Sequence, residues 1–444
     1  MSMKHELMAA CAALSFVVSS SAFAGENKDL EALRAEIQAM RMAYEGQINK
    51  LEDRIEELEG ASQVVPTSVR SAEASAQSSS NSFNPAVSAV LSGSYSAYSE
   101  DSSELAGFAI GEEGERGAEN FSLGETEITL SANVDDKFYG STTVALVEEG
   151  GETVVELEEA YIETLGLGHG LNLKAGRFFQ TLGYLNEHHA HADDFVDRPL
   201  PYRAFLNKAY NDDGVELSWL LPTDFYAEIG GGVFSGRDFP SGSPNDSAIG
   251  SFTGYGRIGG DLTDDLNWRL GASVLSTDTD GRDGNEDTVS FIGESNLYIA
   301  DLRANWAPTG NAAQQEVTLQ GEYFYRDEDG TYEDTDAGSG VVDYDDHQSG
   351  WYLQSLYKFA PQWKIGARYS TLYTSDVPTG LVGTALDAEG HDPETWSLVG
   401  EWRNSEFGRL RAQYNREELS NGVEDDQVKL QYIMSIGAHG AHKF

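Results

Sequence analysis

Three of the nine histidines, His188, His189 and His191, lie within four residues of one another. If this segment is helical, His191 shares a face with Glu187 and with His188; if it is extended, His189 and His191 share a face. Either conformation offers two imidazoles beside a carboxylate, a donor set that suits zinc or a similar borderline metal. The candidate metal ligands are Glu187, His188, His189, His191, Asp193 and Asp194.

The same pattern has a second interpretation, in which the histidines pack and hydrogen-bond their segment against the rest of the protein. Under the first interpretation, zinc or another divalent cation is a cargo or a ligand of the segment, and no cofactor is required. No serine nucleophile stands beside the histidines, and Ser218 lies in an ordinary strand pattern. We therefore predict that the protein is not an enzyme.

A second acidic group loosely resembles an oxygen-rich calcium loop. Asp278, Asp280 and Asp283 lie near two glycines in the sequence DTDGRDGNED, and carboxylates at such spacing can surround Ca²⁺. The closing glutamate of an EF-hand is missing. The alternative interpretation is a solvated acidic rim.

The elements that must position these residues are β-strands. From residue 84 onward apolar and polar residues alternate, as in EVTLQGEYFYR from Glu316 to Arg326. This period of two gives each strand one apolar and one polar face. We count sixteen strands, which begin near residues 86, 121, 137, 152, 171, 213, 225, 252, 266, 295, 315, 349, 363, 394, 408 and 426.

The connections between the strands alternate in length. Outer-membrane barrels show this asymmetry, with tight periplasmic turns and longer external loops. We therefore predict an all-β fold over residues 84–444, a 16-stranded antiparallel transmembrane β-barrel. The short turns include 134–136, 222–224 and 263–265, and the long connections include 100–120, 179–212, 278–294 and 328–348.

The N-terminal part has a different organisation. Residues 1–24 predict a signal peptide that ends in the cleavage motif Ala22-Phe23-Ala24; the alternative is a lipoprotein cleaved before Cys11, the only cysteine. Residues 25–60 carry a heptad seam that predicts a periplasmic α-helical coiled coil, or alternatively a helix packed on its own barrel. Residues 61–83, rich in serine and alanine, predict a flexible linker.

The formal net charge of −45 argues against nucleic acid as a partner and suits exposed loops that attract cations. After the signal peptide the sequence contains no apolar run long enough for a membrane-spanning helix, which excludes an inner-membrane protein.

The connection 179–212 is predicted to fold into the barrel lumen and to form the constriction. Its Arg198 and Arg203 follow the acidic Asp193, Asp194 and Asp197, and opposed basic and acidic groups across a pore would create a transverse field that selects polar solutes. Alternatively, these charges pair and fix the loop. Because the inward positions carry charges of both signs, we expect a water-filled lumen rather than an apolar plug. The candidate pore residues on the inward positions of the strands are Lys174, Arg269, Arg303 and Arg368.

Several of these features together resemble a known family. They include the first strand opening Phe83-Asn84-Pro85-Ala86, the segment NEHHAHADDFVDRPLPYRAF and the terminal AHGAHKF. In these the chain resembles proteobacterial outer-membrane porins of the TonB-independent siderophore-porin type and related zinc-regulated outer-membrane proteins. The resemblance implies a 16-stranded barrel that takes up a metal or a metal chelate without a plug domain. It supplies no binding residues.

The sequence thus favours a porin-like channel for small solutes, with a metal ion or metal chelate, such as zinc or a ferric siderophore, as cargo. The alternatives are a general non-selective porin and a structural protein that tethers the outer membrane to the cell wall. A TonB-dependent receptor would need a plug domain and about 22 strands. The expected partners are outer-membrane lipid, lipopolysaccharide and further copies of the chain in a trimer.

Overall fold

The computed structural model describes residues 85–149, 152–242 and 249–437. The predicted signal peptide (1–24), coiled coil (25–60) and linker (61–83) lie outside these residues, as does the terminal motif at 438–444. Among the described residues, no helix combines the length and the apolar character needed to cross a membrane.

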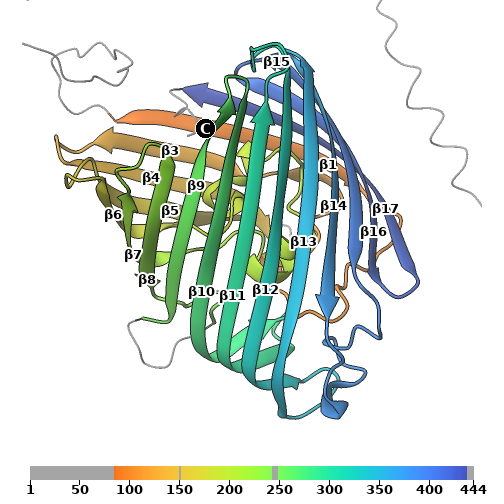
Figure 1. Ribbon diagram of the computed structural model, residues 1–444. Coiled ribbons are helices and arrows are strands. Elements are labelled where there is room, and N and C mark those ends of the chain that lie inside the picture. Colours follow the sequence, from red (N-terminus) through yellow and green to blue (C-terminus); the bar gives the residue numbers. More distant parts are fainter. Residues whose placement is uncertain (1–84, 150–151, 243–248, 438–444) are drawn as a thin grey trace, which may run out of the picture. The chain divides into compact units, whose positions relative to one another are not determined.

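The described residues form one antiparallel sheet of 17 strands with one short α-helix, α2 (Leu200–Leu206), and four 3-10 turns (Figure 1). The strands are β1 (Ala86–Ala97), β2 (Asn120–Leu123), β3 (Thr126–Asn133), β4 (Phe138–Glu149), β5 (Glu152–Thr164), β6 (Leu171–Phe179), β7 (Asn211–Leu220), β8 (Tyr226–Phe234), β9 (Ser251–Thr263), β10 (Leu266–Gly284), β11 (Val289–Trp306), β12 (Glu316–Asp334), β13 (Val342–Ala360), β14 (Trp363–Thr374), β15 (Glu394–Ser405), β16 (Gly408–Ser420) and β17 (Val423–Gly437). The 3-10 turns are η1 (Glu112–Gly114), η2 (Leu185–Glu187), η3 (Ala190–Ala192) and η4 (Thr379–Leu381).

The sheet closes on itself through β1. One edge of β1 pairs with β17, and the other edge pairs first with β3 and then with β2. β2 and β3 are therefore two halves of one wall strand, interrupted at Gly124, where a Cβ would lie 2.4 Å from the Ser92 hydroxyl oxygen. The prediction of a 16-stranded antiparallel barrel is confirmed.

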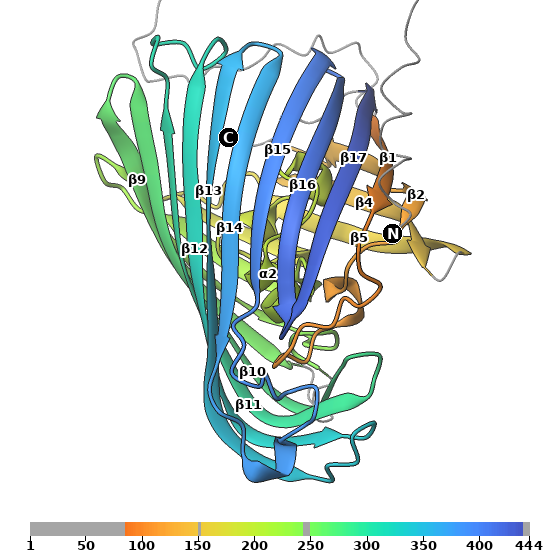
Figure 2. The ribbon, with the colours of Figure 1, turned by 90° about the vertical axis from the view of Figure 1, so that its right-hand side faces the viewer.

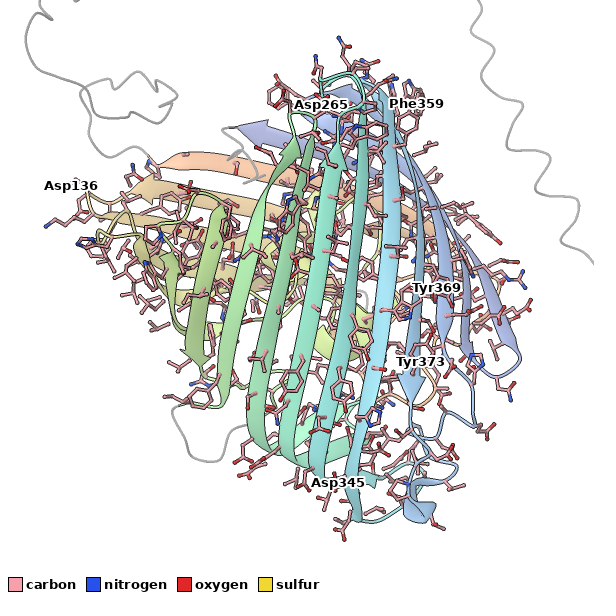
Figure 3. The ribbon with its side chains drawn as sticks, in the orientation of Figure 1. Asp136, Asp265, Asp345, Phe359, Tyr369 and Tyr373 are labelled. Carbon is pink, nitrogen blue, oxygen red and sulfur yellow. The ribbon has the colours of Figure 1, made fainter. Side chains whose placement is uncertain are left out.

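The two faces of the wall differ as the alternation predicts. On β16, Leu410 and Tyr414 are exposed on the outer face, whereas Arg411, Gln413 and Asn415 are buried on the inner face. The two ends differ too: Asp265 and Phe359 lie beside short turns at one end, and Asp345 lies at the end with the long connections (Figure 3).

The strands β10 to β13 are longer than predicted. Each has 18 or 19 residues, so they continue into the predicted loops 278–294 and 328–348 (Figure 1). The acidic composition of these segments concealed the continuation of the strands. The aspartates occupy exposed positions, whereas the adjacent Thr277 and Thr279 are buried.

The candidate calcium loop is therefore wrong in conformation. Asp278, Asp280 and Asp283 are exposed residues of strand β10. Successive same-face positions of a strand stand about 7 Å apart along an extended backbone, so these carboxylates do not wrap around one ion.

The lumen contains more apolar packing than predicted. Eighteen buried residues form one cluster, with Phe108, Phe205 and Leu206 from the connections packed against wall residues such as Leu275 and Phe324. The mixed charges of the inward positions did not predict this apolar cluster. The connections bring apolar side chains of their own, and the wall provides inward-facing apolar residues where they dock.

Candidate functional site

Residues 180–210, called here the lumen loop, connect β6 to β7 and lie inside the barrel, where Figure 2 shows α2 behind the wall strands. The buried Asn186 side chain joins the two ends of the loop. Its Nδ2 donates to the carbonyls of Gln180 and Tyr210, and its Oδ1 accepts from the Tyr210 amide.

The centre of the lumen loop is fixed by Tyr202 on α2. Pro199 precedes the helix and all seven helix residues are buried. The Tyr202 hydroxyl donates to Glu322 of β12, 2.9 Å from Oε2, and accepts from the amides of Leu185 and Asn186 at 2.9 and 3.2 Å. One side chain thus joins α2, the preceding part of the loop and the wall.

The part of the loop from Asp193 to Arg198, called here the aspartate end, is bound to basic wall residues. Asp194 lies 2.5 Å from the Lys364 ammonium, and Asp197 forms ion pairs with Arg368 and Lys429. Burial raises the pKa of Asp197, but Lys429 and Arg368 outweigh it and hold that pKa well below the usual range.

The other predicted constriction residues are paired as well. Arg198 lies 2.6 Å from Asp193 and Arg203 lies 3.3 Å from Glu417 of β16. This is the pairing that the second interpretation of these charges predicts. The remaining pairs are Glu187 with Arg257, Arg269 with Asp301, Arg303 with Asp194, and Lys174 with Glu159.

The part of the loop from His188 to His191, the histidine end, contacts acidic wall residues instead. His191 Nδ1 lies 2.6 Å from Glu127 Oε1 on β3. His189 Nδ1 lies 3.1 Å from Glu158 Oε2 and 3.2 Å from Glu127 Oε2, and its Nε2 lies 3.0 Å from Glu159 Oε2.

The electrostatics of this cluster favour a positive charge on His189. Burial lowers the pKa of His189, but hydrogen bonds to Glu127 and Glu158 raise it by more, so that it lies well above the usual value. His188 faces away: its ring stacks on Tyr184 and burial lowers its pKa to about 3.

A β-bulge places the two adjacent glutamates of β5 at the same imidazole. Thr143 of β4 pairs with Glu159, and Val144 pairs with Leu157, so that Glu158 is an extra residue in the ladder. In a regular strand consecutive side chains point to opposite faces, but a bulge redirects one of them. Both carboxylates therefore contact His189.

The structure brings together two of the six candidate metal ligands, His189 and His191. Glu187, Asp193 and Asp194 lie in ion pairs with arginine or lysine, and His188 contacts the backbone of Tyr184. The wall residues Glu127, Glu158 and Glu159 were not predicted, although a Glu-Glu doublet breaks the alternation of β5 and was a usable signal.

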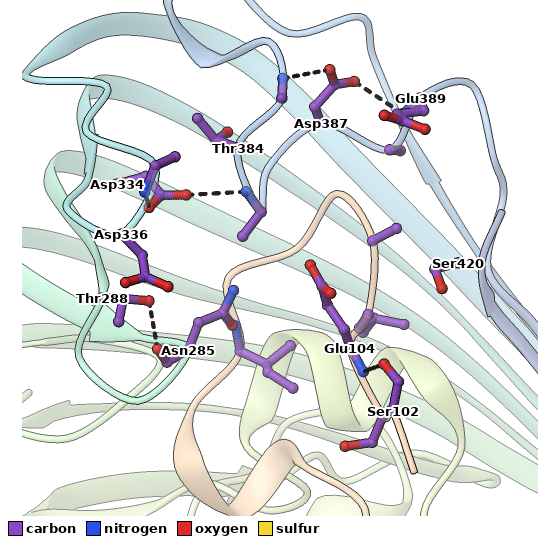
Figure 4. A pocket seen from close by; sticks show the side chains of 18 of the residues that line it. Ser102, Glu104, Asn285, Thr288, Asp334, Asp336, Thr384, Asp387, Glu389 and Ser420 are labelled. Carbon is purple, nitrogen blue, oxygen red and sulfur yellow. Dashed lines mark hydrogen bonds between the residues drawn. The ribbon is translucent and has the colours of Figure 1, made fainter. Parts of the chain in front are cut away.

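A cavity of about 800 Å³ lies at the end of the barrel with the long connections (Figure 4). Its lining comes from five connections and includes seven carboxylates but, among the described residues, no lysine, arginine or histidine. Burial, together with Glu286 and Glu112, raises the pKa of Glu115. The acidic lining residues are Glu104, Glu115, Glu286, Asp334, Asp336, Asp387 and Glu389.

Comparison with known proteins shows the fold. No protein-family model matches the chain. An uncharacterized protein of Aquifex aeolicus (strain VF5) is 26% identical over a match of 424 positions that covers 89% of this chain and 85% of that protein.

Three solved structures resemble the barrel. The outer-membrane channel DcaP of Acinetobacter baumannii matches with a TM-score of 0.52 and 10% identity over 80% of this chain and 97% of its own. OprB of Pseudomonas putida matches with a TM-score of 0.51 and 10% identity, over 80% of this chain and 94% of its own. Salmonella typhi OmpF, in a complex with daunomycin, matches with a TM-score of 0.51 and 11% identity, over 79% of this chain and 97% of its own. The chain therefore has the fold of outer-membrane porins.

Proposed function

We propose that this porin-like barrel is an outer-membrane channel for the uptake of small solutes, with a metal cation or a cationic metal chelate as cargo. The observation that carries the proposal is the acidic cavity at the mouth with the long connections (Figure 4). A cleft lined by one sign of charge raises the local concentration of the opposite ion and its rate of entry.

Carboxyl groups are also present on the inner face of the wall, away from the lining of this cavity. Glu127 on β3, Glu159 on β5 and Glu216 on β7 are buried inward-facing residues of neighbouring parts of the wall. Glu216 Oε2 is buried without a hydrogen-bond partner. These carboxylates offer a cation successive favourable positions along one side of the lumen.

The lumen loop supports a size limit for the cargo. Ion pairs hold it to β9, β11, β14, β16 and β17, and Tyr202 holds it to β12. A loop fixed at so many points keeps its place, so it restricts passage to small solutes. In this proposal the protein lies in the outer membrane among lipid and lipopolysaccharide, and the segment 25–60 assembles it as a trimer in the periplasm.

The test measures ion selectivity in planar bilayers under a salt gradient, with zinc and neutral-sugar uptake into liposomes measured in parallel. We expect cation preference in the wild type and its loss in Glu104→Gln/Asp336→Asn/Glu389→Gln. Asp334 and Asp387 stay unchanged, because they accept from loop amides. The matched control is Asp278→Asn/Asp280→Asn on the exposed face of β10.

Conduction without cation preference would indicate a general porin. A folded protein that passes neither ions nor sugar would indicate a structural, tethering role, and either result would overturn the proposal.

A further inference from the structure

The strongest unassigned site is the cluster at the histidine end of the lumen loop. We propose that His189, His191, Glu127 and Glu158 bind one borderline divalent cation of the zinc class, with Glu159 orienting His189. The inference rests on the proposed function, because it names the class of cargo and the place where the channel holds it.

The donor atoms already converge. One ligand atom each from Glu127, His189 and His191 lies within 4.8 Å of the others. The same Glu127 carboxylate faces both imidazoles, at 2.6 Å from His191 Nδ1 and 3.2 Å from His189 Nδ1. Glu158 Oε2 lies 3.1 Å from that His189 nitrogen. Two nitrogens and two carboxylates make a four-coordinate set of the kind that zinc accepts.

The second nitrogen of His189 has the partner that a metal ligand needs. A histidine that binds metal through one nitrogen usually donates its other N–H to a carboxylate, which fixes the tautomer and the ring. Nε2 of His189 lies 3.0 Å from Glu159 Oε2. The ring of Phe179 packs edge-on against His189 at 5.2 Å and limits its rotation.

The charge of the cluster also calls for a cation. Three glutamates of low exposure meet two imidazoles, and Glu127 is 2% exposed. A further carboxyl group, Glu125, lies with its oxygen within 4.8 Å of Glu127 and Glu158.

The nitrogen donors set the metal class. Calcium and magnesium favour sites built of oxygen alone, whereas imidazole suits zinc, copper, iron and nickel. The aspartates of the loop do not compete for the ion, because lysine and arginine already neutralise them.

The experiment measures metal binding apart from transport. Full-length protein refolded in detergent carries His439→Ala/His442→Ala throughout, to remove two other imidazoles. Zinc content is measured after equilibrium dialysis, and cobalt is used as a probe because its absorption spectrum reports coordination. We expect one ion per chain, bound through nitrogen and oxygen.

The variants distinguish the residues that bind the metal from a neighbouring residue that does not. Glu127→Gln and His189→Ala/His191→Ala should abolish the four-coordinate cobalt spectrum, and Glu159→Gln should weaken zinc binding about 10- to 100-fold, as loss of an orienting carboxylate does. The matched control is His188→Ala, in the same loop but facing Tyr184, and it should bind as the wild type does. A heat-induced mobility shift on gels verifies that each variant is folded, and Glu127→Gln and Glu159→Gln keep the test valid if the histidine variant fails to fold.

Two outcomes overturn the inference: wild-type protein without one ion per chain, or Glu127→Gln that binds as tightly as the wild type. Zinc uptake into liposomes then separates the two proposals. If the protein takes up zinc selectively but binds no ion in the lumen loop, the proposal of a channel holds and the proposal of a metal site fails. If it binds zinc but does not take it up, the metal site holds and zinc is not the cargo.

Discussion

At one end of the lumen loop, Asp194 and Asp197 contact lysine and arginine of the wall, whereas at the other end His189 and His191 contact glutamates. Lys429 and Arg368 hold the pKa of Asp197 well below its usual range, so this carboxylate stays charged and ion-paired across the physiological pH range. An imidazole can exchange its proton for a metal, so in the site proposed above the histidine end would be the exchangeable attachment. The aspartate end would then keep the loop in place while the proposed site gained or lost its cation.

The largest effect should come from breaking the aspartate end. Asp197→Ala leaves Arg368 and Lys429 buried without their carboxylate, and removing one partner of a buried pair costs about 3–5 kcal/mol. Hydrogen exchange should accelerate across 193–207 while 186–191 stays protected, and conductance should rise. Asp280→Ala on the exposed face of β10 is the control; equal acceleration at both ends would show that they are not separate.

A smaller effect is expected at Tyr202, which couples the two ends. Tyr202→Phe leaves the buried Asn186 amide without the hydroxyl that accepts from it, whereas Glu322 and the Leu185 amide still bond to each other. An unsatisfied buried group costs about 1–3 kcal/mol. Exchange should increase at both ends, in contrast to Asp197→Ala. If hydrogen exchange increased at one end of the loop while the other end stayed protected, Tyr202 would not couple the two ends.

Acidification should separate the loop from the mouth. The pKa of Asp197 is lowered, so its stabilising contribution is present above the unfolded value of about 3.9 and is lost only as pH falls through the lower folded value. The pKa of Glu115 is raised, so as the pH falls this mouth carboxylate is protonated, and loses its charge, earlier than an ordinary glutamate does. Bilayer recordings from pH 7 to pH 4 should show falling cation preference at unchanged conductance; a conductance increase in that window would refute it.

The smallest effect should come from salt. Between about 0.1 M and 1 M the screening length falls from roughly 10 Å to 3 Å, which weakens exposed charges far more than buried pairs. Cation preference from the acidic mouth should decline, while hydrogen exchange of the lumen loop stays the same. Loop exchange that rises with salt would show that its ion pairs are accessible to solvent ions.

The sequence was sufficient for the wall and for the identity of the loop. Alternation and short turns placed fourteen of sixteen strand starts within three residues, but β11 and β13 begin six and seven residues earlier than predicted. Their outer parts are polar on one face and carry Asp-rich turns, which concealed strand pairing that continues beyond the apolar region.

The sequence predicted the histidines of the candidate site but not its glutamates. His189 and His191 lie in one segment, so their proximity could be read from spacing, but Glu127 and Glu158 lie 64 and 31 residues from their histidine partners. Only the closed barrel brings them there. Spacing also could not distinguish His188 from its neighbours, because the choice depends on the turn between η2 and η3, where His188 turns to Tyr184.

The bulge in β5 has an evolutionary consequence. Because Glu158 is the extra residue, loss of its single codon would restore regular pairing while Leu157 and Glu159 keep their partners Val144 and Thr143. An ancestral gene could therefore have gained this carboxylate, and a descendant could lose it, by one in-frame triplet, with loss only of the Glu158 carbonyl that accepts a hydrogen bond from the Asn211 side chain of β7 among the printed backbone contacts of that residue. The proposed cation site would then change while the pairing of β4 with β5 on either side of the bulge stays the same.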